Sequence, residues 1–350
     1  LKAKRILAMI PLFQRGQFDI IHTWQDWCNI YGGIAAMISG CNNIILSGRT
    51  LPPVMKGRLQ ARSGRSYADS YRYLLKSDKV KMTHNSDSGR IAYSDWLGIP
   101  KDDFSVIHNG LETGKYSQIN KKRVNQLRQE IGISKKTKVV GTVGRLTSDK
   151  RPWIFLGIAE RILANSENFT YSRELEKWIN ENNSGSESEL EINSLIQDNE
   201  SIEDINFIMV GDGPQLEKAR QIVEKSEILR GKVHLVGYSS EVNLFLEIFD
   251  CFILTSKVEG LPNVLIEAQF CGVPVLTTDA GGAKECIIEG ETGYLSNTDS
   301  IEDLSTKLRN ILNDKKFLKS SKNKSKNFAK ESFGEDTWSN KINELYAGNA

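Results

Sequence analysis

Short apolar runs rich in Ile and Val recur along the chain, and each is followed by a loop and a longer segment of helical character, such as residues 67–76. This alternation is typical of parallel strands joined by crossover helices. The predicted strands cover residues 18–23, 44–47, 80–83 and 104–108 in the first half, and 139–143, 206–210, 233–236, 251–254 and 274–277 in the second. The pattern therefore predicts the α/β class with two parallel sheets.

A polar connector rich in Lys and Asn, residues 113–138, separates the two series of strands, and 350 residues exceed what one hydrophobic core usually serves. We therefore expect a first domain over 1–135, a second over 136–331 and a closing amphipathic helix over 332–350. Four residues share the apolar face of that helix: Trp338, Ile342, Leu345 and Tyr346. Ligands of such sheets bind beyond the carboxyl ends of the strands, so a cleft between the domains is the expected site.

Two segments depart from this pattern. Residues 165–204 are dense in Asn, Ser and Glu and resemble a solvated insertion, within which residues 171–179 have apolar side chains at helical spacing. The chain begins at Leu1 inside what looks like a continuing helix, residues 1–13, without the pattern of a signal peptide. We interpret this start as an N-terminal truncation.

Composition narrows the class of protein. No apolar run approaches the length of a membrane span, and the five cysteines have no paired spacing. We therefore expect a globular cytoplasmic protein. The net charge of +2 requires neither nucleic acid nor an anionic membrane as a partner.

Two carboxylates, Glu259 and Glu267, flank the start of a predicted helix after the strand that ends near Leu254. Pro262 suits the first helical turn, which leaves Glu259 in the loop and Glu267 about one turn inside the helix. Ionised carboxylates can hold the paired hydroxyls of a sugar ring and of a ribose. The alternative interpretation is a surface helix with ordinary acidic residues.

Three further features suit a ligand with a diphosphate. Gly260 allows close approach of the backbone, and the free N–H groups near Asn263 favour a phosphate. Arg145 and Lys150 follow the first strand of the second domain, where their charges can neutralise a diphosphate, although Lys150 also fits a solvated loop. Glycine-containing loops follow other strands at the same edge, and each alone is explained by turn chemistry: Gly211–Pro214, Gly237–Tyr238 and Ala280–Ala283.

Taken in order, these motifs resemble family 4 retaining glycosyltransferases of the GT-B fold. The resemblance rests on GRLTSDK (144–150), VGDGP (210–214), VHLVGY (233–238), EGLPNVLIEA (259–268) and GVPVLTTDAGGAKECIIEGETGYL (272–295), and in the first half on FDIIHTWQDW (18–27) and residues 85–110 with WLGIP and IHNG. It implies two Rossmann-like domains around a central cleft, the first of them incomplete here because the family's N-terminal glycine-rich loop has no match. It also implies a final helix that returns to the first domain.

The resemblance further implies a role for each matched residue. Arg145 and Lys150 would hold the diphosphate, Glu259 the donor sugar and Glu267 the ribose. Gly260, Leu261, Pro262 and Asn263 would line the sugar and phosphate, and Gly237 and Tyr238 would border the base, with Gly211 on the same rim. The implied reaction retains the anomeric configuration without a bound metal or another cofactor, and a UDP-sugar is expected ahead of a GDP-sugar.

On the acceptor side the sequence leaves more open. Many family members have a histidine where this chain has residues 46–49, so Arg49 is either a ligand contact or a loop residue. His22 is a second candidate, although a lone histidine at a strand end, like His84 and His108, more often has a packing or capping role. Basic residues gather nearby, and they fit either a phosphorylated or lipid-diphosphate acceptor at a membrane surface or a solvated face: Arg49, Lys56, Arg58, Arg62 and Arg65.

The predicted function is transfer of a sugar from a nucleotide-diphosphate sugar to a glycan or lipid-linked acceptor, in bacterial surface polysaccharide synthesis by family analogy. A catalytically silent nucleotide-sugar-binding module and a GT-B-like nucleotide-sugar epimerase remain alternatives. A phosphorylase would need a lysine-bound pyridoxal phosphate, for which the sequence offers no site. A nucleic-acid-binding protein fits poorly, because the paired glutamates would repel a phosphate backbone.

Overall fold

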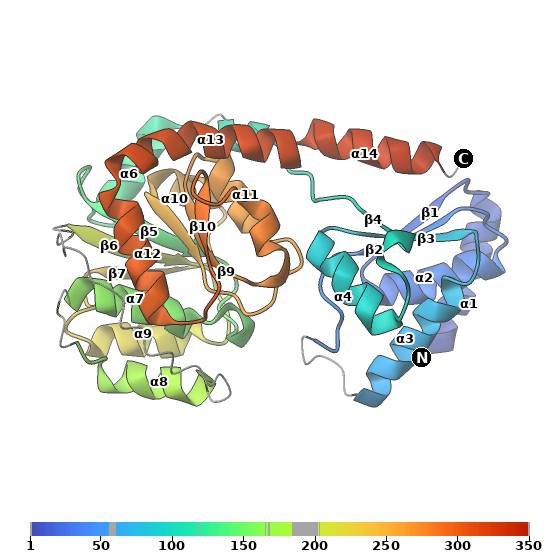
Figure 1. Cartoon of the computed structure of the whole chain (residues 1–350), viewed down its shortest axis with the longest axis horizontal. Coiled ribbons are helices and arrows are strands. Elements are labelled where there is room, and N and C mark those ends of the chain that lie inside the picture. The colour runs from blue at the N-terminus through green and yellow to red at the C-terminus, as the bar shows by residue number, and fades with distance from the viewer. Residues whose placement is uncertain are drawn as a thin grey trace.

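The computed structural model describes residues 2–55, 61–117, 119–164, 166, 169–183, 202 and 204–348. In these ranges the chain forms two units, each built on one sheet of parallel strands with helices packed against it (Figure 1). This confirms the predicted α/β class. Each of the nine predicted strands is present, with boundaries shifted by no more than three residues.

The first unit contains a four-stranded sheet in the order β1-β2-β3-β4. Its strands are β1 (Ile21–Trp24), β2 (Ile44–Gly48), β3 (Val80–His84) and β4 (Phe104–Val106). Its helices are α1 (Lys2–Gly16), α2 (Asp26–Ile38), α3 (Ala61–Leu74), α4 (Asp87–Leu97) and the 3-10 helix η1 (Lys101–Asp103). The helix predicted at the start of the chain is thus present as α1.

The second unit contains a six-stranded sheet in the order β10-β9-β8-β5-β6-β7. Its strands are β5 (Lys138–Val143), β6 (Ile205–Val210), β7 (Val233–Gly237), β8 (Cys251–Leu254), β9 (Val275–Thr278) and β10 (Gly293–Ser296). The chain builds outward from β5 through β6 to β7, and then returns to the other side of β5 with β8. The strand order therefore reverses between β5 and β8, which is where doubly wound sheets bind ligands.

Helices cover both faces of the second sheet, and two clusters of buried apolar side chains fill the space between. The strands are accordingly apolar on both sides; every residue of β6 is buried. The helices are α7 (Pro152–Ala164), α8 (Arg173–Asn183), α9 (Leu216–Lys225), α10 (Val242–Ile248), α11 (Asn263–Phe270), α12 (Ile301–Asn313) and the 3-10 helices η2 (Ser148–Lys150) and η3 (Gly281–Cys286). Most of the acidic segment 165–204 lies outside the described residues.

Two connections join the units. The predicted polar connector contains α5 (Gly114–Ser117) and α6 (Lys121–Glu130), and the chain ends with α13 (Lys315–Phe333) and α14 (Glu335–Ala347). These last helices run from the second unit across to the first (Figure 1). The Tyr346 hydroxyl lies 3.0 Å from Nδ1 of His22, and Nζ of Lys81 donates to the carbonyl of Gly348 at 3.1 Å. The predicted closing helix therefore packs against the first unit.

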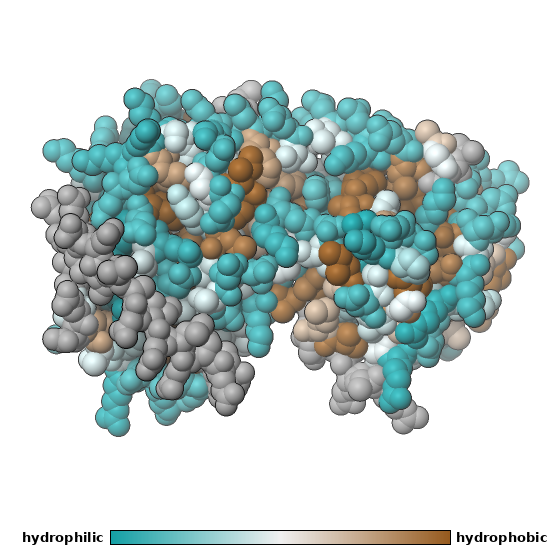
Figure 2. All heavy atoms as spheres, in the orientation of Figure 1, coloured by the Kyte–Doolittle hydropathy of each residue, from teal (hydrophilic) through white to brown (hydrophobic). Residues whose placement is uncertain are grey.

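The surface in the view of Figure 2 is mostly hydrophilic over both units, and a notch separates them at its lower edge. A search of the described residues for helices that could span a membrane, by length and apolar content, found none.

Helix α8, which lies within the acidic segment, contributes buried side chains to the core of the second unit. Trp178 is 1% exposed, and its ring centroid lies 5.6 Å from that of Trp153 on α7. We expect Trp178→Ala to lower the free energy of unfolding by about 3–5 kcal/mol, because it removes a fully buried aromatic side chain.

Urea denaturation followed by circular dichroism measures this change. The control is Lys177→Ala on the exposed side of the same helix, for which a change within about 0.5 kcal/mol is expected. Equal effects of the two substitutions would contradict a structural role for α8.

Candidate functional site

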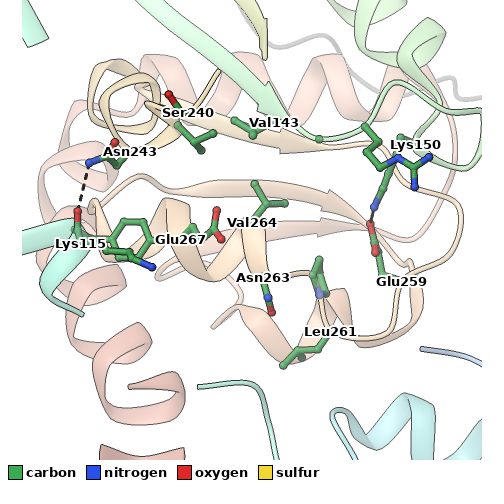
Figure 3. A pocket seen from close by; sticks show the side chains of 15 residues that line it. Lys115, Val143, Lys150, Ser240, Asn243, Glu259, Leu261, Asn263, Val264 and Glu267 are labelled. Atoms are coloured by element: carbon green, nitrogen blue, oxygen red, sulfur yellow. Dashed lines mark hydrogen bonds and ion pairs between the residues drawn. The ribbon is translucent and has the colours of Figure 1, made fainter. Parts of the chain in front are cut away.

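A cavity of about 970 Å³ opens where the loops after β5 and β8 meet (Figure 3). It lies at the reversal of strand order, as the topology requires. Seven of the predicted site residues line it: Arg145, Lys150, Glu259, Leu261, Pro262, Asn263 and Glu267. The connector and the segment after β7 supply further walls, namely Lys115, Tyr116, Ser240, Val242 and Asn243.

Lys150 and Glu259 form an ion pair inside this cavity (Figure 3). Lys150 ends η2, whereas Glu259 lies in the loop between β8 and α11, so the pair joins the two loops at the reversal. Both side chains are largely shielded from solvent, with exposed fractions of 28% and 13%. Each charge therefore has a partner, and both groups border the same space as Arg145.

Arg151 fixes the relative position of these loops, and the sequence reasoning gave it no role. It is 5% exposed and its φ of 50° lies in the left-handed region, which is unusual for a residue with a side chain. Its guanidinium donates to the carbonyls of Thr255 at 2.6 Å and Ser256 at 2.9 Å, just before the Glu259 loop. Thr255 in turn donates its hydroxyl to the carbonyl of Lys150 at 2.8 Å, which closes the link.

Helix α11 presents Glu267 to the cavity. Pro262 has an extended backbone as the N-cap and Asn263 is the first helical residue, so Glu267 is the fifth. The helix starts one residue later than expected, because Pro262 precedes the first turn instead of belonging to it. The predicted relation of a loop Glu259 and a helical Glu267 is otherwise present in the structure.

Burial raises the pKa of Glu267, and hydrogen bonding by Tyr116 and the charge of Lys115 offset this only in part. The same burial raises the pKa of Tyr116, whose ring stacks on Phe270 with centroids 5.4 Å apart. The connector thus positions an aromatic side chain against α11. Its polar composition gave no sign of this contact.

Four predicted residues lie outside the wall of the cavity: Gly260, Gly211, Gly237 and Tyr238. A Cβ on Gly260 would come within 2.5 Å of the carbonyl oxygen of Arg49, and one on Gly211 within 1.8 Å of that of Gly144. Both glycines therefore allow backbones to approach each other. Tyr238 is 80% exposed, and Ser240, Val242 and Asn243 line the cavity in its place.

The two acceptor-side candidates lie close together on the first unit. His22 stacks on Trp24 with centroids 4.5 Å apart, and the guanidinium of Arg49 lies 4.7 Å from the centre of the same indole. Burial and the Arg49 charge lower the pKa of His22 to about 4, so its ring is neutral at pH 7. Burial lowers the pKa of Arg49 to about 10, which leaves it charged.

The proposed basic face is only partly described. Arg65 is exposed at the start of α3. Lys56, Arg58 and the side chain of Arg62 lie outside the described residues. Both interpretations of this face, as a ligand-binding surface and as a solvated surface, therefore stay predictions.

Asn109, in the predicted IHNG motif, connects the first unit to the cavity. Its side-chain amide donates to Oδ1 of Asn263 at 2.5 Å, and Asn109 is 5% exposed. The motif was predicted as part of a resemblance, without a role for this residue. Its position at the start of α11 is a contact between the two units.

A site for a metal ion would need clustered ligands. In the part of the chain that the structure describes, no group of three or more His, Cys, Asp or Glu side chains is arranged to hold one. The cationic groups that line the cavity are Lys115, Arg145 and Lys150.

Comparisons with known proteins agree with this fold. Residues 189–330 match the family described as Glycosyl transferases group 1. The chain is 31% identical over 293 residues to the Vi polysaccharide biosynthesis protein VipC/TviE of Salmonella typhi, which covers 83% of this chain and 43% of that protein. It is 25% identical over 328 residues to UDP-Gal:alpha-D-GlcNAc-diphosphoundecaprenol alpha-1,3-galactosyltransferase of Escherichia coli, over 91% of this chain and 73% of that one.

Among solved structures, Anabaena Alr3699/HepE in complex with UDP superposes with a TM-score of 0.76 at 18% identity, over 98% of this chain and 82% of that one. This likeness shows a shared GT-B fold. The protein is therefore a GT-B protein of two units, and its cavity lies where the strand order of the second sheet reverses. The family match over residues 189–330, the curated relatives and the structural neighbours together support a group 1 glycosyltransferase.

The raised pKa of Glu267 predicts a pH dependence of nucleotide binding. A carboxylate accepts hydrogen bonds from ribose hydroxyls only while ionised, so affinity for UDP-glucose should fall as the pH decreases toward the raised pKa of Glu267. Glu267→Gln should bind more weakly at pH 8 and show a flatter pH profile.

Calorimetric titrations between pH 5 and 8 measure both effects. UDP-glucose is the suitable probe, because its diphosphate stays ionised throughout. A pH profile identical in Glu267→Gln and the wild type would contradict the role of this carboxylate.

Arg151 is expected to stabilise the fold through its side chain. Arg151→Gly keeps the left-handed backbone accessible and removes the guanidinium bonds, so the free energy of unfolding should fall by about 1.5–3 kcal/mol. Affinity for UDP-glucose should fall with it, because the two loops lose their link.

A matched control is Gln17→Gly, since Gln17 also has a positive φ, 46°, but is exposed. That substitution should leave stability unchanged or slightly raised. If urea denaturation shows Arg151→Gly to be as stable as Gln17→Gly, the guanidinium bonds contribute nothing.

Proposed function

We propose that this chain is a retaining glycosyltransferase that moves a sugar from a nucleotide-diphosphate sugar, a UDP-sugar before a GDP-sugar, to a glycan or lipid-diphosphate-linked acceptor. One observation carries the proposal: Arg145, Lys150, Glu259 and Glu267 surround a single cavity at the reversal of strand order. The chain spans 43% of the Salmonella typhi relative and 73% of the Escherichia coli relative. Activity is therefore proposed for this chain and does not follow from theirs.

The cavity suggests how the donor would lie. Ribose hydroxyls would meet Glu267 near Tyr116, and the diphosphate would lie between Arg145 and Lys150. Glu259 would accept hydrogen bonds from the donor sugar. In that arrangement Lys150 exchanges its carboxylate partner for a phosphate, and Glu259 exchanges its ammonium partner for hydroxyls.

The chemistry follows from charge. As the bond from the anomeric carbon to the phosphate oxygen breaks, negative charge develops on the leaving diphosphate. Fixed cations then stabilise the transition state more than the ground state. We propose that the acceptor hydroxyl attacks from the face that the diphosphate leaves and passes its proton to a departing phosphate oxygen, which retains the anomeric configuration.

The setting is proposed from the relatives. The Escherichia coli relative is named for a diphosphoundecaprenol substrate, and a Staphylococcus aureus relative, 25% identical over 323 residues, for capsular polysaccharide biosynthesis. A lipid-linked acceptor would place the reaction at the inner face of the plasma membrane. The cationic Arg49 on the first unit suits an acceptor with a diphosphate.

Substitution of the charged residues tests the proposal. Glu259→Ala and Arg145→Ala should each lower kcat for UDP-sugar cleavage by about 100-fold or more. Arg145→Ala removes a positive charge beside the leaving diphosphate, and Glu259→Ala removes the acceptor of hydrogen bonds from the donor sugar. Lys257→Ala, on an exposed residue of the same loop, is the control and should keep its activity.

Release of UDP from UDP-glucose, UDP-galactose and UDP-N-acetylglucosamine, with and without lipid-linked acceptors and in the presence of EDTA, measures the effect. Full activity in either alanine variant would overturn the assignment. Binding of UDP without turnover would favour the binding-module alternative.

A further inference from the structure

Glu285 joins the two units at a contact outside the cavity. It lies on η3 of the second unit, and its carboxylate accepts hydrogen bonds from the backbone N–H of Asp87 at 2.7 Å and of Ser88 at 2.9 Å. These are first-turn N–H groups of α4, which have no partner within the helix and favour a negative charge. Nε2 of His108 lies 3.2 Å from the same carboxylate.

The contact extends to the backbone of η3. The hydroxyl of Ser88 donates to the carbonyl of Gly281 at 3.0 Å. In Figure 1, α4 lies on the side of the first unit that faces the second. Burial by itself would raise the pKa of Glu285. The hydrogen bonds from His108, Ser88 and Asp87 outweigh this effect, so the pKa is lowered.

Behind Glu285, η3 touches the loop that holds Glu259. A Cβ on Gly281 would come within 2.5 Å of the carbonyl oxygen of Glu259, and one on Gly282 within 1.9 Å of that of Gly260. Gly260 in turn touches the backbone of Arg49 at the end of β2. The backbones of η3, the Glu259 loop and the loop after β2 therefore pack against one another at these glycines, and α4 is joined to η3 by the side chains of Glu285 and Ser88.

We infer that Glu285 is a positioning residue, which sets the first unit against the sugar end of the donor cavity by anchoring η3 to the start of α4. The inference rests on the proposed function for its catalytic consequence. Glu285 does not line the cavity. Its effect passes through the backbone of η3 to Glu259. It therefore acts on the donor sugar and on the position of the first unit, and it leaves binding of the nucleotide unchanged.

Hydrogen exchange tests the anchor directly. In Glu285→Ala the amides of Asp87 and Ser88 should exchange at least about ten-fold faster, because each loses a hydrogen bond to a charged group. Glu285→Gln, which keeps one accepting oxygen, should give an intermediate rate. Lys284→Ala, on the exposed neighbour, should match the wild type. Unchanged exchange in Glu285→Ala would overturn the inference.

Kinetics test the consequence. In Glu285→Ala the Kd for UDP should stay within about two-fold, whereas kcat for cleavage of the best of the three UDP-sugars should fall by about ten-fold, with partial recovery in Glu285→Gln. An equal loss of UDP affinity and kcat would show general disruption and overturn a positioning role. If the wild-type chain binds no UDP, the proposed function is wrong, while the exchange rates still decide whether Glu285 anchors the two units.

Discussion

The ion pair between Lys150 and Glu259 depends on the adjacency of β5 and β8, and the rest of the site depends on that pair. The strand order reverses between these strands, so their following loops diverge from one point and leave space between them. Opposite charges on the two loops form an ion pair in that space. Arg151 supports the arrangement through hydrogen bonds to the backbone carbonyls of Thr255 and Ser256.

The second constraint is the close approach of the two units. Glycines at 260, 281 and 282 let three backbone segments pack together, and Asn109 and Glu285 make polar contacts across the same boundary. A cleft between units can open and close only as far as such contacts permit. The cavity and the boundary therefore meet at Glu259, whose side chain pairs with Lys150 and whose backbone packs against η3.

Much of the fold could be predicted from the sequence, because buried parallel strands are rich in apolar residues, and β6 (INFIMV) and β8 (CFIL) have this form. The strand β10 was not predicted, since GYLS is short and only half apolar. Arg145, Lys150 and Glu259 follow strands and Glu267 lies near the start of α11, so the place of these four could be inferred from position alone. Tyr116 could not, because a residue in a polar connector shows no periodicity that points to α11.

The glycines and Glu285 show a different limit. Gly260 and Gly211 were assigned to the ligand by motif, but their contacts are with backbone carbonyls, and such contacts appear only when separate loops are placed together. Glu285 lies within a matched motif, yet its partners, Asp87 and Ser88, are about 200 residues away in the chain and belong to the other sheet. Such pairings between distant segments leave no local pattern in a single sequence.

We propose that the cavity at the β5–β8 reversal binds a nucleotide-diphosphate sugar through Glu267, Arg145, Lys150 and Glu259. A crystal structure of the chain soaked with UDP-glucose tests it most directly. We expect density with the ribose at Glu267, the diphosphate between Arg145 and Lys150, and the Lys150–Glu259 pair opened by the sugar. Density for the nucleotide elsewhere, or a bound nucleotide that leaves Glu267 and Arg145 untouched, would contradict it.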